Sequence, residues 1–343
     1  MLDSRSQRVL WAVVESYIDS PDPVGSRYVT KKYEFGLSPA TIRNIMADLE
    51  DLGFLTQPHT SAGRVPTDMG YRFYVENILA PPEENMARMS EQMTNRLLTA
   101  GGDVDDILQE ATRLISSFSH YLGVASLPRT ENSTLHKIEM MNYKDDRIVV
   151  MLFTNEGTIK HKIIPNELSL EQRDLGRISS YLSERFTGKN IKEIRSSLVR
   201  EMKEQKSEFD ALIERTLAIF GEGSDNAGDD VLITGFKEVV NLPDFSDIDK
   251  IKILSEAIED KHTIVKLLDK IVDNDGVQVI IGSENRIEGL SNMSMVATTY
   301  RESNRPVGVL GIIGPTRMNY QNAIVLVDAA ARCLDRMLGG NSS

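Results

Sequence analysis

Strand-like segments lie on both sides of a long helical stretch, and this order limits the possible folds more than any other feature. Three alternating runs in residues 135–165 are separated by turn signals, which predicts a three-stranded meander. Residues 168–220 have helical periodicity, and strand patterns return at 231–235, 277–282, 295–300 and 306–313. The simplest interpretation is an α+β domain whose sheet is completed late, with a mainly helical insertion between its halves.

The prolines of Ala80-Pro81-Pro82-Glu83-Glu84 predict a linker that ends an N-terminal domain. The expected domains are therefore residues 1–80, a sheet domain formed by 81–165 and 231–343, and an inserted domain at 166–230. Helices are also expected at 84–100, 103–118 and 247–271. The last helix should bury one face, made of Tyr320, Ile324, Val327, Ala331, Leu334 and Leu338.

Composition limits the class of protein. The chain has 343 residues, of which 41% are apolar and 26% charged, so wholesale disorder is excluded. Its one cysteine, Cys333, excludes a disulfide framework and a multi-cysteine zinc site. Neither a signal peptide nor a membrane span is expected, and a reducing cytoplasm is the expected location. The net charge of -12 argues against nucleic-acid binding unless basic residues gather locally.

The first eighty residues have the pattern of a helix-turn-helix unit. Residues 8–18 predict one helix, and Ser26 is expected to cap a short second helix. Ser38 and Pro39 suit the cap and the first position of a third helix. Leu37 and Ile42 can form a hydrophobic staple across this cap. The third helix should bury Ile42, Ile45, Leu49 and Leu52 before Gly53 ends it.

A hairpin is expected directly after the third helix. Residues 54–57 predict a strand, 58–63 a tight loop and 64–65 a returning strand. Thr67 can then cap a closing helix. Helix, turn, capped helix and hairpin in this order predict a winged helix-turn-helix domain.

Basic residues gather where such a domain meets DNA. Residues 1–79 carry 8 Lys and Arg against 10 Asp and Glu, but residues 24–46 have a net charge of +3. A recognition helix meets base edges with its N-terminal residues. There Arg43 suits guanine, Asn44 suits adenine, and Thr41 can reach bases or phosphates. The acids Asp48, Glu50 and Asp51 lie at the other end of the helix.

Long motifs resemble a known family. PVGSRYVTKKYEFGLSPATIRNIMADLEDLGFLTQPHTSAGRVPTDMGYRFYV resembles the winged-helix region of the HrcA family of bacterial heat-inducible transcription repressors. VQVIIGSEN, SMVATTYRESNRPVGVLGIIGPTRMNY and the final helix are similar to that family's C-terminal signature, and LPDFSDIDK fits its middle. The two end motifs are long and specific, whereas residues 168–220 match mainly in pattern.

The resemblance implies a homodimeric repressor of chaperone operons that binds double-stranded DNA at an inverted repeat called CIRCE. It implies that the chaperonin GroEL keeps the repressor active, and that a dimerisation domain is inserted into a GAF-like domain. No cofactor, metal or membrane contact is expected. The implied DNA-binding positions are Arg27, Lys31, Lys32, Ser38, Thr41, Arg43, Asn44, His59, Ser61 and Arg64, with Thr60 in the same wing.

Several of these residues have a simpler interpretation. Ser38 can serve only as a cap, and His59 can serve only to complete the wing turn. Arg72 is expected to be a solvated or structural residue rather than a phosphate contact. These alternatives stay open from the sequence.

Other function classes fit less well. Gly308, Gly311 and Gly314 have G-x-x-G-x-x-G spacing, which lacks the dinucleotide-binding pattern and suggests backbone packing and a turn. No base, nucleophile and acid assemble into a catalytic set, so an enzyme is not expected. The alternative is a regulator whose GAF-like domain binds a small effector, or a protein-binding module without DNA contact. The effector would meet Ser283, Glu284, Asn285, Tyr300 and Arg317, unless these residues form turns and contacts between domains.

Overall fold

The computed structural model describes residues 2–59, 62–77, 89, 91–97, 104–128, 134–144, 147–155, 159–166, 169–190, 193–194, 231–272, 274–287, 289–302 and 305–339. The chain divides into two compact units. The discontinuous unit comprises Met1–Leu127 and Asp230–Ser343, and the inserted unit comprises Pro128–Asp229. Both contain helices and antiparallel strands, so the chain is α+β as predicted.

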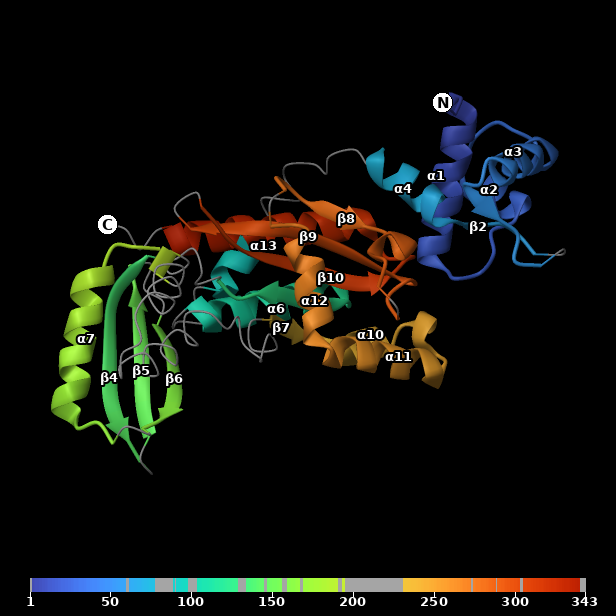
Figure 1. Ribbon diagram of the computed structural model, residues 1–343. Coiled ribbons are helices and arrows are strands. Elements are labelled where there is room, and N and C mark those ends of the chain that lie inside the picture. Colours follow the sequence, from blue (N-terminus) through green and yellow to red (C-terminus); the bar gives the residue numbers. More distant parts are fainter. Residues whose placement is uncertain are drawn as a thin grey trace. The chain divides into compact units, whose positions relative to one another are not determined.

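The discontinuous unit begins with the predicted order of helices and hairpin (Figure 1). Strands β1 and β2 pair antiparallel, with Leu55 opposite Pro66. The hydroxyl of Thr67 accepts from the amide of Gly70 and caps the helix that follows, as predicted. The elements are α1 (Ser4–Asp19), α2 (Ser26–Lys32), α3 (Pro39–Asp51), β1 (Leu55–Thr56), β2 (Val65–Pro66) and α4 (Asp68–Glu76).

Two local predictions in this segment are wrong. Gly25, not Ser26, is the cap residue of α2, and the helix has no side-chain cap there. Leu52 is 56% exposed, because it follows the last helical residue and leaves the apolar face of α3. Met46 is the buried residue between Ile42 and Leu49, whereas Ile45, which was predicted to be buried, is only partly so.

A five-stranded antiparallel sheet forms the centre of the discontinuous unit. Its strand order is β7-β3-β10-β9-β8. The sequence predicted four of these strands but not β3, which lies between β7 and β10 and is buried along its whole length. The strands are β3 (Leu122–Ser126), β7 (Val231–Thr234), β8 (Gln278–Ile280), β9 (Met293–Glu302) and β10 (Arg305–Pro315).

Helices cover both faces of this sheet (Figure 1). Along β10, Leu310 and Ile312 join the core with α6 (Val104–Ser119) and α13 (Tyr320–Gly339). Val309 and Ile313 face the opposite core with helices of the 236–269 region. Because both faces of β10 are buried, its residues 309–313 (VLGII) form an unbroken apolar run rather than an alternating pattern. The second set of helices is α10 (Phe236–Val240), η2 (Pro243–Phe245), α11 (Ile248–Glu259) and α12 (Lys261–Asp269).

Glycines of β10 allow close packing, as the sequence suggested. A Cβ at Gly311 would overlap Ala297 of the neighbouring strand, and one at Gly314 would lie 2.7 Å from the ring of Tyr121. Their spacing therefore reflects strand and ring contacts. The single helix expected at 247–271 is instead two helices, which meet at Asp260.

The inserted unit contains the predicted meander, in the order β4-β5-β6. Helix α7 lies along β4 (Figure 1), and its Ser179 and Ser183 hydroxyls accept from the amides of Met140 and Ile138 at 2.9 and 3.0 Å. Apolar side chains of α7 and the meander form one core. The elements are β4 (Leu135–Tyr143), β5 (Arg147–Thr154), β6 (Ile159–Pro165) and α7 (Gln172–Phe186).

The predicted domain borders differ from this division. The meander was assigned to the large sheet, with a border at 165/166, but its strands pair with one another and pack on α7. The border therefore lies between Leu127 and Pro128. Residues 1–80, expected as a separate domain, share one core with α6, α13 and the five-stranded sheet.

Some predictions lie outside the described residues. These are the linker at 80–84, the part of the predicted helical stretch that follows residue 194, and the wing residues Thr60 and Ser61. Among the described helices, none is both long and apolar enough to cross a bilayer.

Candidate nucleic-acid interface

The first turn of α3 is organised by Ser38. Its hydroxyl accepts from the amide of Thr41 at 3.1 Å and lies 2.9 Å from the Thr41 hydroxyl. Pro39 occupies the first helical position, where no amide hydrogen is needed. Leu37 is partly buried against the same core that buries Ile42. The predicted cap is confirmed, and it fixes where the exposed residues of the first two turns point.

Arg43 and Asn44 lie on the exposed face of α3, opposite the buried Ile42, Met46 and Leu49. Neither side chain has a hydrogen bond or ion pair with any residue that the structure describes. Thr41 is also exposed, although its hydroxyl is close to that of Ser38. The face that α3 presents therefore carries a guanidinium and an amide free to form new hydrogen bonds.

Helix α2 packs beside α3 and carries the basic residues Arg27, Lys31 and Lys32, all exposed. Lys32 is already paired, because its ammonium lies 2.7 Å from the Asp19 carboxylate. This hydrogen bond raises the pKa of Lys32 above its ordinary value. Arg27 and Lys31 have no such partner in the described part of the chain, so they carry the available positive charge of α2.

The basic residue of the hairpin, Arg64, is largely buried against the end of α3. A guanidinium nitrogen of Arg64 lies 2.7 Å from the Glu50 carboxylate at the end of α3, and the Arg64 side chain is only 18% exposed. Its backbone pairs with Val24 through two hydrogen bonds of 2.9 Å. The carbonyl of His59 accepts from Ala62 and closes the turn, while the His59 side chain is exposed. Arg64 thus ties the hairpin to α3 and to the chain before α2.

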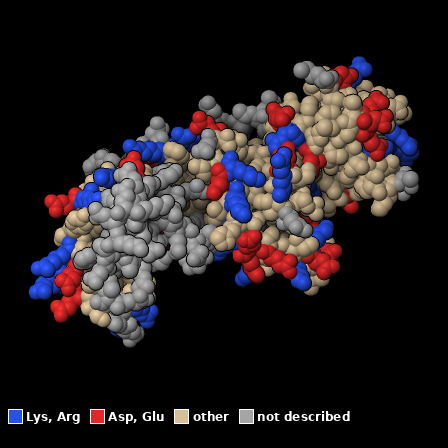
Figure 2. Space-filling view, in the orientation of Figure 1, with Lys and Arg blue, Asp and Glu red and all other residues tan. Residues whose placement is uncertain are grey.

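The charge on this segment is local. In Figure 2 the part formed by α1–α4 carries separate red and blue groups on a mostly tan surface. The acids Asp48 and Asp51 are exposed in the last turns of α3, away from its first turn. Positive charge is therefore available at the start of α3 and on α2 rather than as a broad field.

One exposed residue was not singled out from the sequence. Tyr28 is 49% exposed on α2, on the same side of the helix as Arg27 and Lys31, while Val29 is buried. The Lys32 ammonium lies 5.8 Å from the centroid of its ring. An exposed aromatic residue among basic residues was the signal that sequence reasoning missed.

The residues considered for a small effector serve other contacts. Ser283 donates to Asp68 of α4, and Glu284 forms an ion pair with Arg72. Asn285 donates to the carbonyls of Leu290 and Met293, and Tyr300 donates to that of Ser126. Arg317 donates to Asp244 and to the Ile18 carbonyl. These are the turns and contacts between segments that the sequence left open, and Arg72 is structural as expected.

Comparisons with known proteins agree with this organisation. The family model for the HrcA protein C-terminal domain matches residues 105–324. The chain is 43% identical over 342 residues to the heat-inducible transcription repressor HrcA of Thermodesulfovibrio yellowstonii, with 98% of each chain covered. It is 38% identical over 339 residues to the protein of that name from Geobacter sulfurreducens, with 99% of each covered.

A solved structure shares the fold. The crystal structure of a hypothetical protein covers 100% of both chains with a TM-score of 0.62 at 22% identity. The sequence alignments extend over α1–α4, the five-stranded sheet and the inserted unit. The chain therefore belongs to the HrcA family of heat-inducible transcription repressors.

Proposed function

We propose that this repressor binds double-stranded DNA through a winged helix-turn-helix formed by α1–α4 and the β1–β2 hairpin. The observation that carries the proposal is the start of α3. There Arg43 and Asn44 are exposed without partners among the described residues, directly after an N-terminus that Ser38 caps. A capped helix end with a guanidinium and an amide on its open face is suited to reading base edges in a major groove.

The proposed roles follow from which side chains are available. Arg43, Asn44 and Thr41 read bases, while Arg27 and Lys31 contact phosphates. Lys32 contributes less, because it would first have to leave Asp19. Arg64 supports the hairpin through Glu50 rather than meeting DNA in this arrangement. Ser38 acts through its cap, and His59 and Ser61 remain candidates in the wing.

An inverted repeat requires two recognition helices, and we place self-association on the inserted unit. Met141, Val149 and Ile163 stand opposite one another across β4, β5 and β6, on the face away from the α7 core. Met141 and Ile163 are 43% and 42% exposed. Apolar side chains in register on an open sheet face support a surface that a second copy covers.

The proposals about the operator, the sheet domain and the chaperonin rest on family membership. We propose that the operator is a CIRCE-type inverted repeat before chaperone genes, that the five-stranded domain is GAF-like, and that GroEL supports the active form. The repressor would then act in the cytoplasm, at the nucleoid when bound to its operator. If GroEL acts in this way, repressor heated with the chaperonin should recover more operator binding than repressor heated alone; equal recovery would contradict it.

The DNA-reading role of Arg43 is tested by replacing it with alanine. Arg43→Ala should weaken operator binding by about 1–3 kcal/mol while affecting a scrambled duplex little, because one base contact is lost. Lys31→Ala should weaken both duplexes similarly and lower the salt dependence. Fluorescence anisotropy of both duplexes at two salt concentrations measures each effect. An unchanged operator-to-scrambled ratio for Arg43→Ala would remove α3 as the reading element.

A further inference from the structure

The proposed DNA-binding segment is fastened to the five-stranded sheet by polar contacts on the helix that follows the hairpin. Arg72 of α4 donates through Nε to a Glu284 carboxylate oxygen at 2.9 Å and through Nη2 to the Val279 carbonyl at 2.8 Å. Its second Nη2 contact, with the other Glu284 oxygen, makes the ion pair bidentate. Such a paired arrangement fixes direction as well as distance.

A second contact lies one turn earlier on α4. The Asp68 carboxylate accepts from the amide and the hydroxyl of Ser283, at 2.9 and 2.6 Å. Gly282 permits this approach, because a Cβ there would lie 2.7 Å from the carboxyl carbon of Asp68. Its φ of 47° is also one that residues with a Cβ rarely adopt. The turn at 282–285 is therefore shaped to receive the first turn of α4.

A third contact comes from the other end of the segment. Arg317, just after β10, donates to the carbonyl of Ile18 near the end of α1 at 2.9 Å and to Asp244 at 2.8 Å. The Arg317 side chain is only 12% exposed. Contacts to α1 and α4 thus hold the segment at two separate points, which restricts rotation about either one.

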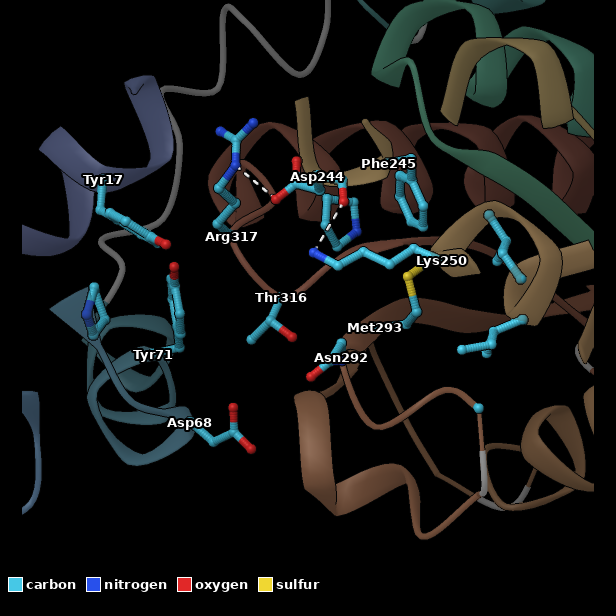
Figure 3. Close-up of a pocket in the computed structure, with 15 residues that line it drawn as sticks. Tyr17, Asp68, Tyr71, Asp244, Phe245, Lys250, Asn292, Met293, Thr316 and Arg317 are labelled. Atoms are coloured by element: carbon cyan, nitrogen blue, oxygen red, sulfur yellow. Dashed lines mark hydrogen bonds and ion pairs between the residues drawn. The ribbon is translucent and has the colours of Figure 1, made fainter. Parts of the chain in front are cut away.

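Apolar packing also crosses this junction, where the ring of Tyr71 on α4 lies 5.8 Å from that of Tyr320 on α13, but it is not continuous there. Beside the contacts lies a cavity of 280 Å³, with Tyr17, Asp68 and Tyr71 on one side and Asp244 and Lys250 on the other (Figure 3). The hydroxyl of Tyr71 and one oxygen of Asp244 are buried there without a partner among the described residues. Because this space lies next to the junction, the directional hydrogen bonds at its edges contribute more to fixing how the α1–α4 segment is oriented on the sheet.

We propose that Arg72, Asp68 and Arg317 are positioning residues that fix the angle of the recognition helix and thereby set the half-site spacing the dimer accepts. This inference rests on the proposed function, because it presupposes DNA binding by α3 and pairing of two copies. It assigns to these residues no base contact. Their loss should leave each α3 able to bind one half-site while relaxing the requirement for a given separation.

The test compares duplexes that carry the two operator arms at the natural separation or moved by about half a helical turn, roughly 5 base pairs. The full-length wild-type chain should prefer the natural separation by on the order of 100-fold, the benefit of engaging both arms at once. The double variant Arg72→Ala with Ser283→Ala should lower this preference to below about tenfold. Glu284→Gln should also lower the preference for the natural separation, but by a smaller factor than the double variant.

The matched control is Arg113→Ala, which removes an exposed arginine paired with Glu110 within α6 and should keep the wild-type preference. Binding to a single arm separates the possible failures. A wild-type chain that binds neither a single arm nor the operator contradicts the proposed function itself. A wild-type chain without spacing preference, a double variant that keeps the full preference, or one that loses single-arm binding overturns the positioning role.

Discussion

At the scale of residues, the local environment decides what each polar side chain does. Ser26 begins α2 and Ser38 precedes α3, yet only the Ser38 side chain accepts a hydrogen bond from a backbone amide of its helix. Lys32 and Arg64 were candidates for DNA contact along with Arg27 and Arg43, but Asp19 and Glu50 hold them in ion pairs. The exposed, unpaired residues could be predicted from periodicity. The paired ones could not, because their partners come from other elements.

The capping difference gives a stability prediction. Ser38→Ala should lower the free energy of unfolding of the N-terminal segment by about 1 kcal/mol, because one amide of α3 loses its acceptor. Ser26→Ala should change it little, since the Ser26 side chain is not the cap. Trp11, the one tryptophan, packs 6.0 Å from the ring of Tyr74 and reports this unfolding by fluorescence. Equal losses for both variants would contradict the assigned cap.

At the scale of elements, periodicity located most helices and strands but not how they combine. Strand β3 escaped prediction because five residues, LGVAS, are too few to show alternation when both faces are buried. The β4–β6 meander was predicted as strands but assigned to the wrong sheet. The partner of this meander is helix α7, which follows it in sequence and whose Ser179 and Ser183 hydroxyls accept hydrogen bonds from β4 amides. The strand pattern alone does not show this partner.

The close packing of β3 is testable at Gly123. A Cβ there would overlap the Thr112 carbonyl on α6, so Gly123→Ala should lower the free energy of unfolding by about 1–3 kcal/mol. Gly176→Ala is the control, because this helical position on α7 has open space around it. There the substitution should raise the free energy of unfolding by about 0.5–1 kcal/mol. Thermal unfolding of both variants measures the difference. A neutral Gly123→Ala would show that α6 and β3 can separate without cost.

At the scale of the whole molecule, the net charge of -12 is unevenly distributed. Residues 1–79 hold a net charge of -2, and residues 24–46 hold +3, so the remaining chain carries most of the negative charge. An acidic body repels DNA while the basic segment attracts it, which favours approach through α2 and α3. Total charge was therefore a poor guide to function, whereas the local distribution was informative.

Self-association through the inserted unit is a prediction at this scale. Ile163→Lys should convert the dimer to a monomer, because it places a charge in the apolar row of the open sheet face. Tyr181→Ser, at a residue 55% exposed on α7, should leave the dimer intact. Sedimentation velocity at micromolar protein distinguishes the species. A monomeric wild-type chain would contradict self-association, and a dimeric Ile163→Lys would contradict pairing through this sheet face.

The sequence alone determined most of the local elements, the cap of α3, the exposed residues near its start and the family resemblance. These depend on neighbours within a few positions or on long motifs, so they can be read along the chain. Only the tertiary structure decided that β3 completes the large sheet, that β4–β6 belong with α7, and that Arg72 and Asp68 meet Glu284 and Ser283. The contacts of Arg72 and Asp68 join residues more than 200 positions apart, and the strand pairings of β3 also connect distant segments, so no local periodicity records them.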